Sequence, residues 1–91
     1  MTIVLPFEVG QAIWTHTIID GQWVTTQCEV DSYSLDKYGV EVTVKYAGGS
    51  HETCFISTDG SIHISEDQVK EHFLFADRDD LICYLREEDL L

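Results

Sequence analysis

The chain of 91 residues carries 17 acidic and 5 basic side chains, which gives a formal net charge of −12 at pH 7. Its length fits one domain over residues 1–91, and its 44% apolar content is too high for a disordered acidic tail. Five lysine and arginine side chains neutralise too few phosphates for direct binding of nucleic acid, and the charge also disfavours an anionic membrane. We therefore expect the partner to be a basic protein surface.

The beginning of the chain and its cysteines both favour a cytoplasmic protein. Met1–Phe7 contains a short apolar run that no lysine or arginine precedes, so we expect neither a signal peptide nor a membrane anchor. The three cysteines, Cys28, Cys54 and Cys83, are odd in number and far apart. Reduced thiols packed as small apolar groups are therefore favoured over a disulfide framework, and one disulfide with a leftover thiol is the alternative.

The first part of the chain predicts two strands joined by a turn. After Gly10 a β-prone stretch runs to Ile19, and Asp20-Gly21 marks a turn. The next strand is expected over Gln22–Asp31, where every second residue shares a face. Ser32–Gly39 is predicted to be an exposed connection. One face of the second strand carries Val24, Thr26, Cys28 and Val30, and the other carries Trp23, Thr25, Gln27 and Glu29.

The middle of the chain predicts a meander of three short strands. Gly39–Ala47 has the clearest alternation, with apolar residues at every second position. Gly48-Gly49 supplies a tight hairpin turn, and His51–Ser57 returns antiparallel. A second turn at Asp59-Gly60 leads into a strand over Ile62–Ile64.

Two interpretations compete for residues 66–76. Ser65 and Gln68 have the spacing of a capping box, which predicts a helix. In the interpretation that we favour, Glu66–Lys70 is a single turn and His72–Phe75 is a closing strand, because aromatic residues are β-prone.

The end of the chain predicts an amphipathic helix over about residues 77–88. Asp77 is a good N-cap, and acidic residues in the first turn favour the helix dipole. Acidic residues at the other end oppose the dipole, so the helix is expected to fray near Glu88.

Together these elements predict a mainly β, α+β fold. It is a small SH3-like partial barrel of five to six antiparallel strands over about residues 7–76, followed by the C-terminal amphipathic helix. Exposed edge strands leave both a monomer and a homodimer open.

The chain resembles small bacterial and phage proteins with an SH3-like barrel. The shared features are structural: an opening Phe-x-Val-Gly with an apolar-Trp pair, a strand-Gly-strand hairpin, an aromatic residue before an Asp-Gly turn, and a closing strand, cap and helix. The resemblance therefore implies a fold and carries no catalytic residue. The matching positions are Phe7, Val9, Gly10, Ile13, Trp14, Val40–Tyr46, Gly49, Phe55–Gly60 and Phe73–Leu81.

Neither a metal nor a catalytic site is predicted. His51-x-x-Cys54 has metal-ligand spacing, with His16, His63 and His72 as further candidates, but zinc domains usually carry two paired motifs. A surface imidazole beside a buried thiol is the favoured interpretation. Because no phosphate loop and no nucleophile–base set stands out, we expect no enzyme and no cofactor.

Two sets of residues are candidates for partner binding. Residues 66–91 hold nine acids against three bases, and their carboxylates are predicted to form a negative ridge that imitates phosphates and inhibits a nucleic-acid-handling enzyme, such as a defence nuclease. The alternatives are a solvated face that only keeps the domain soluble, and an SH3-like peptide-binding adaptor or structural accessory protein that uses aromatic rings. Trp14 is expected in the core instead. The acidic set is Asp77, Asp79, Asp80, Glu87, Glu88 and Asp89, and the aromatic set is Trp23, Tyr33 and Tyr38.

Overall fold

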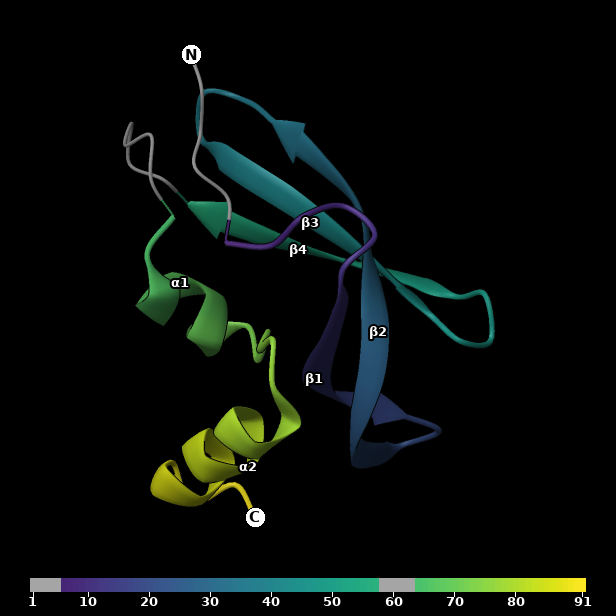
Figure 1. Cartoon of the computed structure of the whole chain (residues 1–91), viewed down its shortest axis with the longest axis vertical. Helices are drawn as coiled ribbons and strands as arrows, with labels where there is room; N and C mark the ends of the chain where they lie inside the picture. Colours follow the sequence, from purple (N-terminus) through teal and green to yellow (C-terminus); the bar gives the residue numbers. More distant parts are fainter. Residues whose placement is uncertain (1–5, 58–63) are drawn as a thin grey trace.

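The computed structural model describes residues 6–57 and 64–91 of the chain. These residues form a mainly β fold, in which four antiparallel strands make a curled half-barrel accompanied by two short helices (Figure 1). The sheet order is β1-β2-β3-β4. The elements are β1 (Ala12–Ile19), β2 (Gln22–Leu35), β3 (Gly39–Tyr46), β4 (His51–Ser57), α1 (Glu66–Glu71) and α2 (Arg78–Glu87).

The predicted mainly β, α+β class is confirmed, but the predicted strand count does not hold for the described residues. The described residues contain four strands instead of five to six. The turn expected at Asp59-Gly60 and the strand expected from Ile62 fall outside the described residues, and Ile64 itself belongs to no strand. The turns at Asp20-Gly21 and at Gly49 are confirmed, with φ values of 51°, 78° and 92°.

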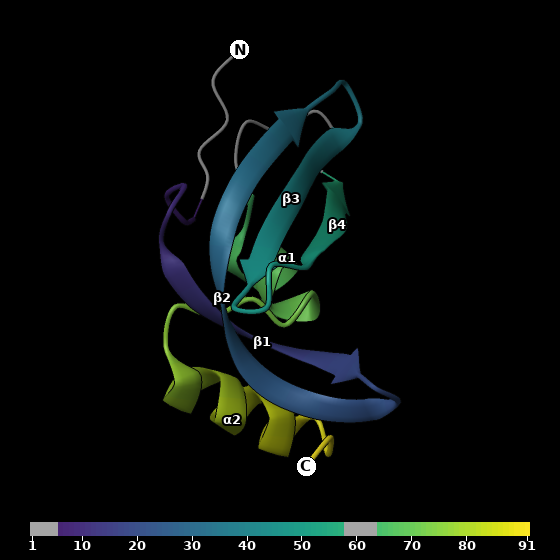
Figure 2. The same cartoon turned by 90° about the vertical axis from the view of Figure 1, so that its right-hand side faces the viewer.

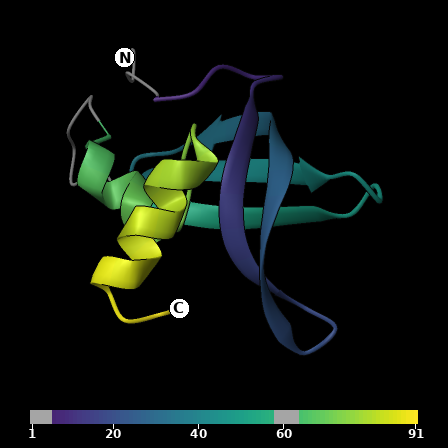
Figure 3. The ribbon, with the colours of Figure 1, turned by 60° about the horizontal axis from the view of Figure 1, so that its bottom comes forward.

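The long strand β2 bends the sheet. Its first half pairs with β1 and its second half with β3, and the register shifts between Val30 and Ser32. Such irregularities bend a strand and increase its twist. As a result, β1 and the first half of β2 run across the direction of β3 and β4 (Figures 2 and 3).

The predicted exposed connection over Ser32–Gly39 is wrong in its first half. β2 continues to Leu35, because the residues from Ser32 onward pair with β3. A short turn suffices to reverse the chain: Asp36 Oδ1 accepts hydrogen bonds from the backbone amides of Tyr38 and Gly39 at 2.7 and 3.0 Å.

The inner face of the half-barrel holds the main core. The alternation predicted for β3 is confirmed, since its even-numbered valines are buried. Val69 of α1 and Leu74 pack against this face. The cluster consists of Phe7, Ile13, Cys28, Val30, Val40, Val42, Val44, Ile56, Ile64, Val69 and Leu74.

A second, smaller core lies on the other face of β1, between this strand and α2, which runs below β1 in Figure 2. Leu81 and Leu85 of α2 are fully buried there together with Phe75. Trp14 is half-buried against this second core, with the Arg78 guanidinium 6.0 Å from its ring centre, and does not lie in the main core. β1 is therefore covered on both faces.

A side-chain hydrogen bond joins the two edge strands of the half-barrel, β1 and β4. Glu52 of β4 accepts hydrogen bonds from the hydroxyl of Thr17 on β1, at 3.1 Å, and from that of Tyr46 on β3, at 2.9 Å. Burial, followed by the hydrogen bond to this carboxylate, raises the pKa of Tyr46. Glu52 thus links strands that are not neighbours in the sheet.

The segment after residue 64 follows the interpretation that we did not favour. Ser65 and Gln68 form the capping box, and α1 covers Glu66–Glu71. The closing strand expected over His72–Phe75 is wrong: a φ of 58° at Phe73 breaks the extended backbone, and only Phe75 makes a β-bridge, with Trp14. The N-cap at Asp77 is confirmed, and α2 ends at Glu87 with Glu88 as its C-cap.

Candidate partner-binding groove

A groove with a volume of about 760 Å³ lies between α1 and α2. Figure 1 shows α1 above α2, with a short connection between them. The connection between them closes the bottom of this α1–α2 groove. It is lined by Pro6, Phe7, Ile64, Glu66, Val69, Lys70, Leu74, Phe75, Ala76, Asp80, Cys83, Tyr84 and Glu87.

The floor of the groove consists of apolar side chains that are nearly buried, and the apolar surface open to a ligand comes mainly from Pro6, Ala76, Cys83 and Tyr84 on its walls. The floor is formed where the two cores meet, with Phe7, Val69 and Leu74 from the main core and Phe75 from the second. Tyr84 lies beside Phe75, with ring centres 5.4 Å apart. A concave, apolar surface with a few charged groups at its edge is typical of binding sites in proteins.

The rim of the groove is acidic. Three carboxylates line it, from Glu66, Asp80 and Glu87, against one ammonium group from Lys70. The Lys70 Nζ lies 3.7 Å from Glu66 Oε1, and this ion pair joins two residues that are one helical turn apart. Asp80 and Glu87 therefore supply the two negative charges of the rim for which the described residues offer no ion pair.

The sequence of α2 explains why these carboxylates face the groove. Its buried stripe is made by Leu81 and Leu85, one turn apart. Residues seven apart lie nearly in line along a helix, so Asp80 and Glu87 share a stripe next to the buried one. Cys83 lies between them on the same stripe and is exposed.

The other predicted acidic residues lie at the ends of α2 and do not line the groove. Asp77 caps the helix, since its Oδ1 accepts a hydrogen bond from the Asp79 amide at 2.8 Å. Glu88 is the C-cap, and Asp89 follows with a φ of 59°. All six acidic residues are exposed, but only Asp80 and Glu87 border the groove.

The three predicted aromatic residues do not lie together. Tyr33 is half-buried, and its hydroxyl donates a hydrogen bond to the carbonyl of Phe7 at 2.9 Å. Tyr38 is 65% exposed in the β2–β3 turn, where the Lys37 ammonium lies 5.0 Å from its ring centre. Trp23 lies at the opposite end of β2. The described residues therefore contain no peptide groove built from all three rings.

Trp23 instead belongs to an aromatic cluster that the sequence analysis missed. Its ring stacks on His16, with centres 5.0 Å apart and an angle of 13° between the planes. Phe73 meets both rings edge-on, and Tyr84 of α2 meets Phe73. His16 is buried, and its Nδ1 lies 3.2 Å from the Thr25 hydroxyl. Alternation along β1 places the side chains of His16 and Ile13 on opposite faces of the strand. This was the signal in the sequence that could have revealed the cluster.

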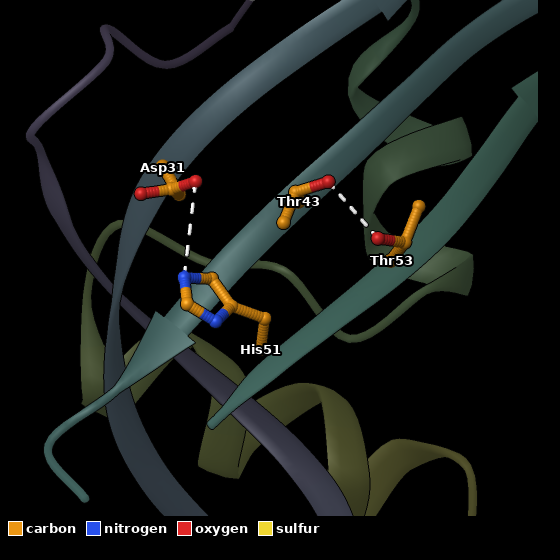
Figure 4. A network of polar contacts seen from close by, with 4 residues as sticks. All are labelled: Asp31, Thr43, His51 and Thr53. Carbon is orange, nitrogen blue, oxygen red and sulfur yellow. Dashed lines mark hydrogen bonds and ion pairs between the residues drawn. The ribbon is translucent and has the colours of Figure 1, made fainter. Parts of the chain in front are cut away.

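The thiols and histidines do not converge within the described residues. Cys28, Cys54 and Cys83 are all free. His51 and Cys54 are three positions apart on a strand, so their side chains leave opposite faces. The His51 Nε2 lies 3.9 Å from Asp31 Oδ2, across β3 (Figure 4). In residues 6–57 and 64–91, no three His, Cys, Asp or Glu side chains are grouped to hold a metal ion.

Comparison of the chain with protein-family models, with curated proteins and with solved structures finds no match. None of the helices in the described ranges has the length and apolar character needed to cross a membrane. The geometry and charge of the α1–α2 groove are therefore the basis for assigning a function.

Proposed function

We propose that this chain is a non-enzymatic interaction protein that binds a basic protein surface through the α1–α2 groove. The observation that carries the proposal is the common stripe of Asp80 and Glu87 along the rim of an apolar groove. Two carboxylates held on one helix beside apolar surface attract a lysine or arginine side chain and offer its methylene stem a place to pack.

The charge of the whole chain supports the same kind of partner. A net charge of −12 is larger than the magnitude of about 2–8 that keeps a small domain soluble. Its field accelerates encounters with cationic proteins and repels nucleic acids and anionic membranes. The acidic residues at both ends of α2 extend this field beyond the groove.

The finer form of the proposal is inhibition of a nucleic-acid-handling enzyme by charge mimicry. The acidic residues of α2 gather at the two ends of this helix of 10 residues, which is about 15 Å long. Basic channels bind duplex DNA by neutralising its phosphates with lysine and arginine, and clustered carboxylates offer such a channel the same sign of charge. The half-barrel is compatible with an SH3-like barrel, and kinship with bacterial and phage proteins of that architecture is part of the proposal.

A pull-down with matched variants tests the proposal. The groove variant combines Asp80→Asn with Glu87→Gln, and the control variant combines Asp20→Asn with Glu41→Gln, which removes the same charge far from the groove. A specific partner should bind the wild type and the control, elute with salt, and bind the groove variant about 5- to 30-fold more weakly, the equivalent of about 1–2 kcal/mol. Equal binding by all three chains would contradict the proposal.

A second candidate function, an adaptor that binds through exposed apolar side chains, has one observation in its favour. Ile18, Ile19 and Trp23 are all exposed at the tip of the β1–β2 hairpin, with Trp23 at 59%. Apolar contacts are not screened by salt. A partner that resists high salt and is lost on Trp23→Ala would favour the adaptor over the acidic interaction protein.

A further inference from the structure

We infer that the α1–α2 groove takes a linear, amphipathic segment of its partner, one that carries both lysine or arginine and large apolar side chains. This inference rests on the proposed function and makes it more specific. Imitation of phosphates requires only exposed carboxylates, whereas this groove combines carboxylates with an apolar floor. The occupant is therefore defined by two kinds of side chain at once.

The floor of the groove supplies the apolar half of the recognition. Val69, Leu74 and Phe75 form its nearly buried base and belong to the two cores, so the helices and the sheet hold the base in place, while Ala76 and Tyr84 beside it offer apolar surface to an occupant. A fixed apolar groove between two helices suits an anchor side chain, and amphipathic segments are commonly recognised in this way. The volume of about 760 Å³ is within the range of about 300–1,000 Å³ found for ligand pockets.

The rim supplies the charged half and selects the sign of the occupant. Asp80 and Glu87 lie two turns apart on one side of the floor. An anchor placed between them would carry flanking lysine or arginine side chains to both carboxylates. An acidic amphipathic segment would place its charges against the same carboxylates and be repelled.

The attraction of the groove for a positive charge is weakest near Lys70. This residue lies on the opposite wall, paired with Glu66 at 3.7 Å. A bound cation can compete for that carboxylate, but it must also approach the ammonium group. The preferred position for the positive charges of the occupant is therefore the α2 wall.

Protection of Cys83 from alkylation tests this inference on the wild-type chain. Cys83 is exposed within the groove, whereas Cys54 is half-buried outside it and serves as the internal control; Cys28 is buried and reports unfolding of the chain instead. The probes are three synthetic peptides. One has lysine and leucine in a helical repeat (the lysine–leucine peptide), the second replaces its leucines by serine, and the third replaces its lysines by glutamate.

Each peptide is first titrated by fluorescence anisotropy, and the rate of alkylation by N-ethylmaleimide is then measured at each cysteine by mass spectrometry. We expect the lysine–leucine peptide to slow the reaction of Cys83 about tenfold at nine-tenths occupancy, because only the free chain reacts, and to leave the half-buried Cys54 unchanged. The lysine–serine peptide should bind at low salt without protecting Cys83 to that degree. The glutamate–leucine peptide should not bind.

The remaining outcomes separate the inference from the proposed function. If the lysine–serine peptide protects Cys83 equally well, or if both cationic peptides bind without protecting it, the inference is overturned while binding of a basic surface stands. Protection by the glutamate–leucine peptide would also overturn it, because the rim would then not select charge. If neither cationic peptide binds at low salt, the proposed function fails as well.

Discussion

Asp80 and Glu87 lie seven residues apart on α2, and both line the same side of the α1–α2 groove. Their common direction follows from the burial of Leu81 and Leu85, which fixes the rotation of the helix against the sheet. The same helix therefore closes the second core with one stripe and lines the groove with the next. Changes to the charge of this groove should affect binding without affecting folding.

Replacement of the one base at the rim should strengthen binding. Lys70→Gln removes a positive charge that faces Asp80 and Glu87 across the groove, so a cationic peptide should bind about two- to fivefold more tightly, the equivalent of about 0.5–1 kcal/mol. Titration of the lysine–leucine peptide at low salt measures the change. Lys45→Gln on β3 is the matched control and should give a smaller gain, since it changes only the net charge. Equal gains in the two variants would mean that the groove has no special role.

The cap of α2 should contribute measurably to stability. Asp77→Ala removes the acceptor for the Asp79 amide and should lower the free energy of unfolding by about 1 kcal/mol. Asp77→Asn keeps an acceptor at the N-cap and should be nearly neutral. Urea unfolding of both variants measures the difference. If both variants lost the same stability, the charge of Asp77 would matter more than its capping bond.

Close packing at the start of β3 should make one glycine irreplaceable. A Cβ atom on Gly39 would overlap the carbonyl oxygen of Ile56 and lie 2.9 Å from Phe55 Cζ, whereas one on Gly48 would meet nothing within 4 Å. Gly39→Ala should therefore cost about 2 kcal/mol or more, and Gly48→Ala should change stability by less than about 1 kcal/mol. Thermal unfolding of the two variants compares them. Equal stability would show that β3 and β4 are not so closely packed at this point.

Stability should decrease at alkaline pH because of a buried thiol. Burial, with the Glu52 carboxylate and Cys54 adding to it, raises the pKa of Cys28 to about 11, from an ordinary value of 9.0. The unfolded chain therefore loses this proton first, so the contribution is complete below pH 9 and is lost as the pH rises toward 11. The loss is at most ~3 kcal/mol.

Burial also raises the pKa of Tyr33 and of Cys54, which act in the same direction. Denaturant unfolding of the wild type and of Cys28→Ala, below pH 9 and near pH 11, isolates the contribution of Cys28 to the loss of stability at alkaline pH. The difference in stability between the two chains should narrow as the pH rises. A difference in stability that stays constant with pH would exclude Cys28 as a cause of the alkaline destabilisation.

Local patterns were sufficient to predict much of the fold. The alternation of valines in β3 and the N-cap at Asp77 each depend on residues close together in sequence, and both predictions are confirmed. The closing strand predicted after Ser65 is wrong, because the capping box with Gln68 outweighs the β-propensity of Phe73 and Phe75. A specific pair of capping hydrogen bonds was the stronger signal.

The groove could be predicted only in part. The acidic character of α2 was visible in the sequence, and its stripe containing Asp80 and Glu87 follows from helical spacing. The opposite wall was not predicted, because it requires α1 to exist and to pack beside α2. The sequence predicts Tyr33 to be a contact residue, whereas its hydroxyl is held by a hydrogen bond to Phe7, 26 residues away, which no local pattern reveals.

The most direct test of the central claim is to map the bound lysine–leucine peptide by nuclear magnetic resonance. Backbone amide shifts of the ¹⁵N-labelled chain would be followed during the titration. Our account predicts that the largest changes fall on groove residues of both helices, including Val69, Cys83 and Glu87. Largest changes at Trp23 on the β1–β2 tip, or at Tyr38 in the β2–β3 turn, with α1 and α2 unaffected, would contradict it.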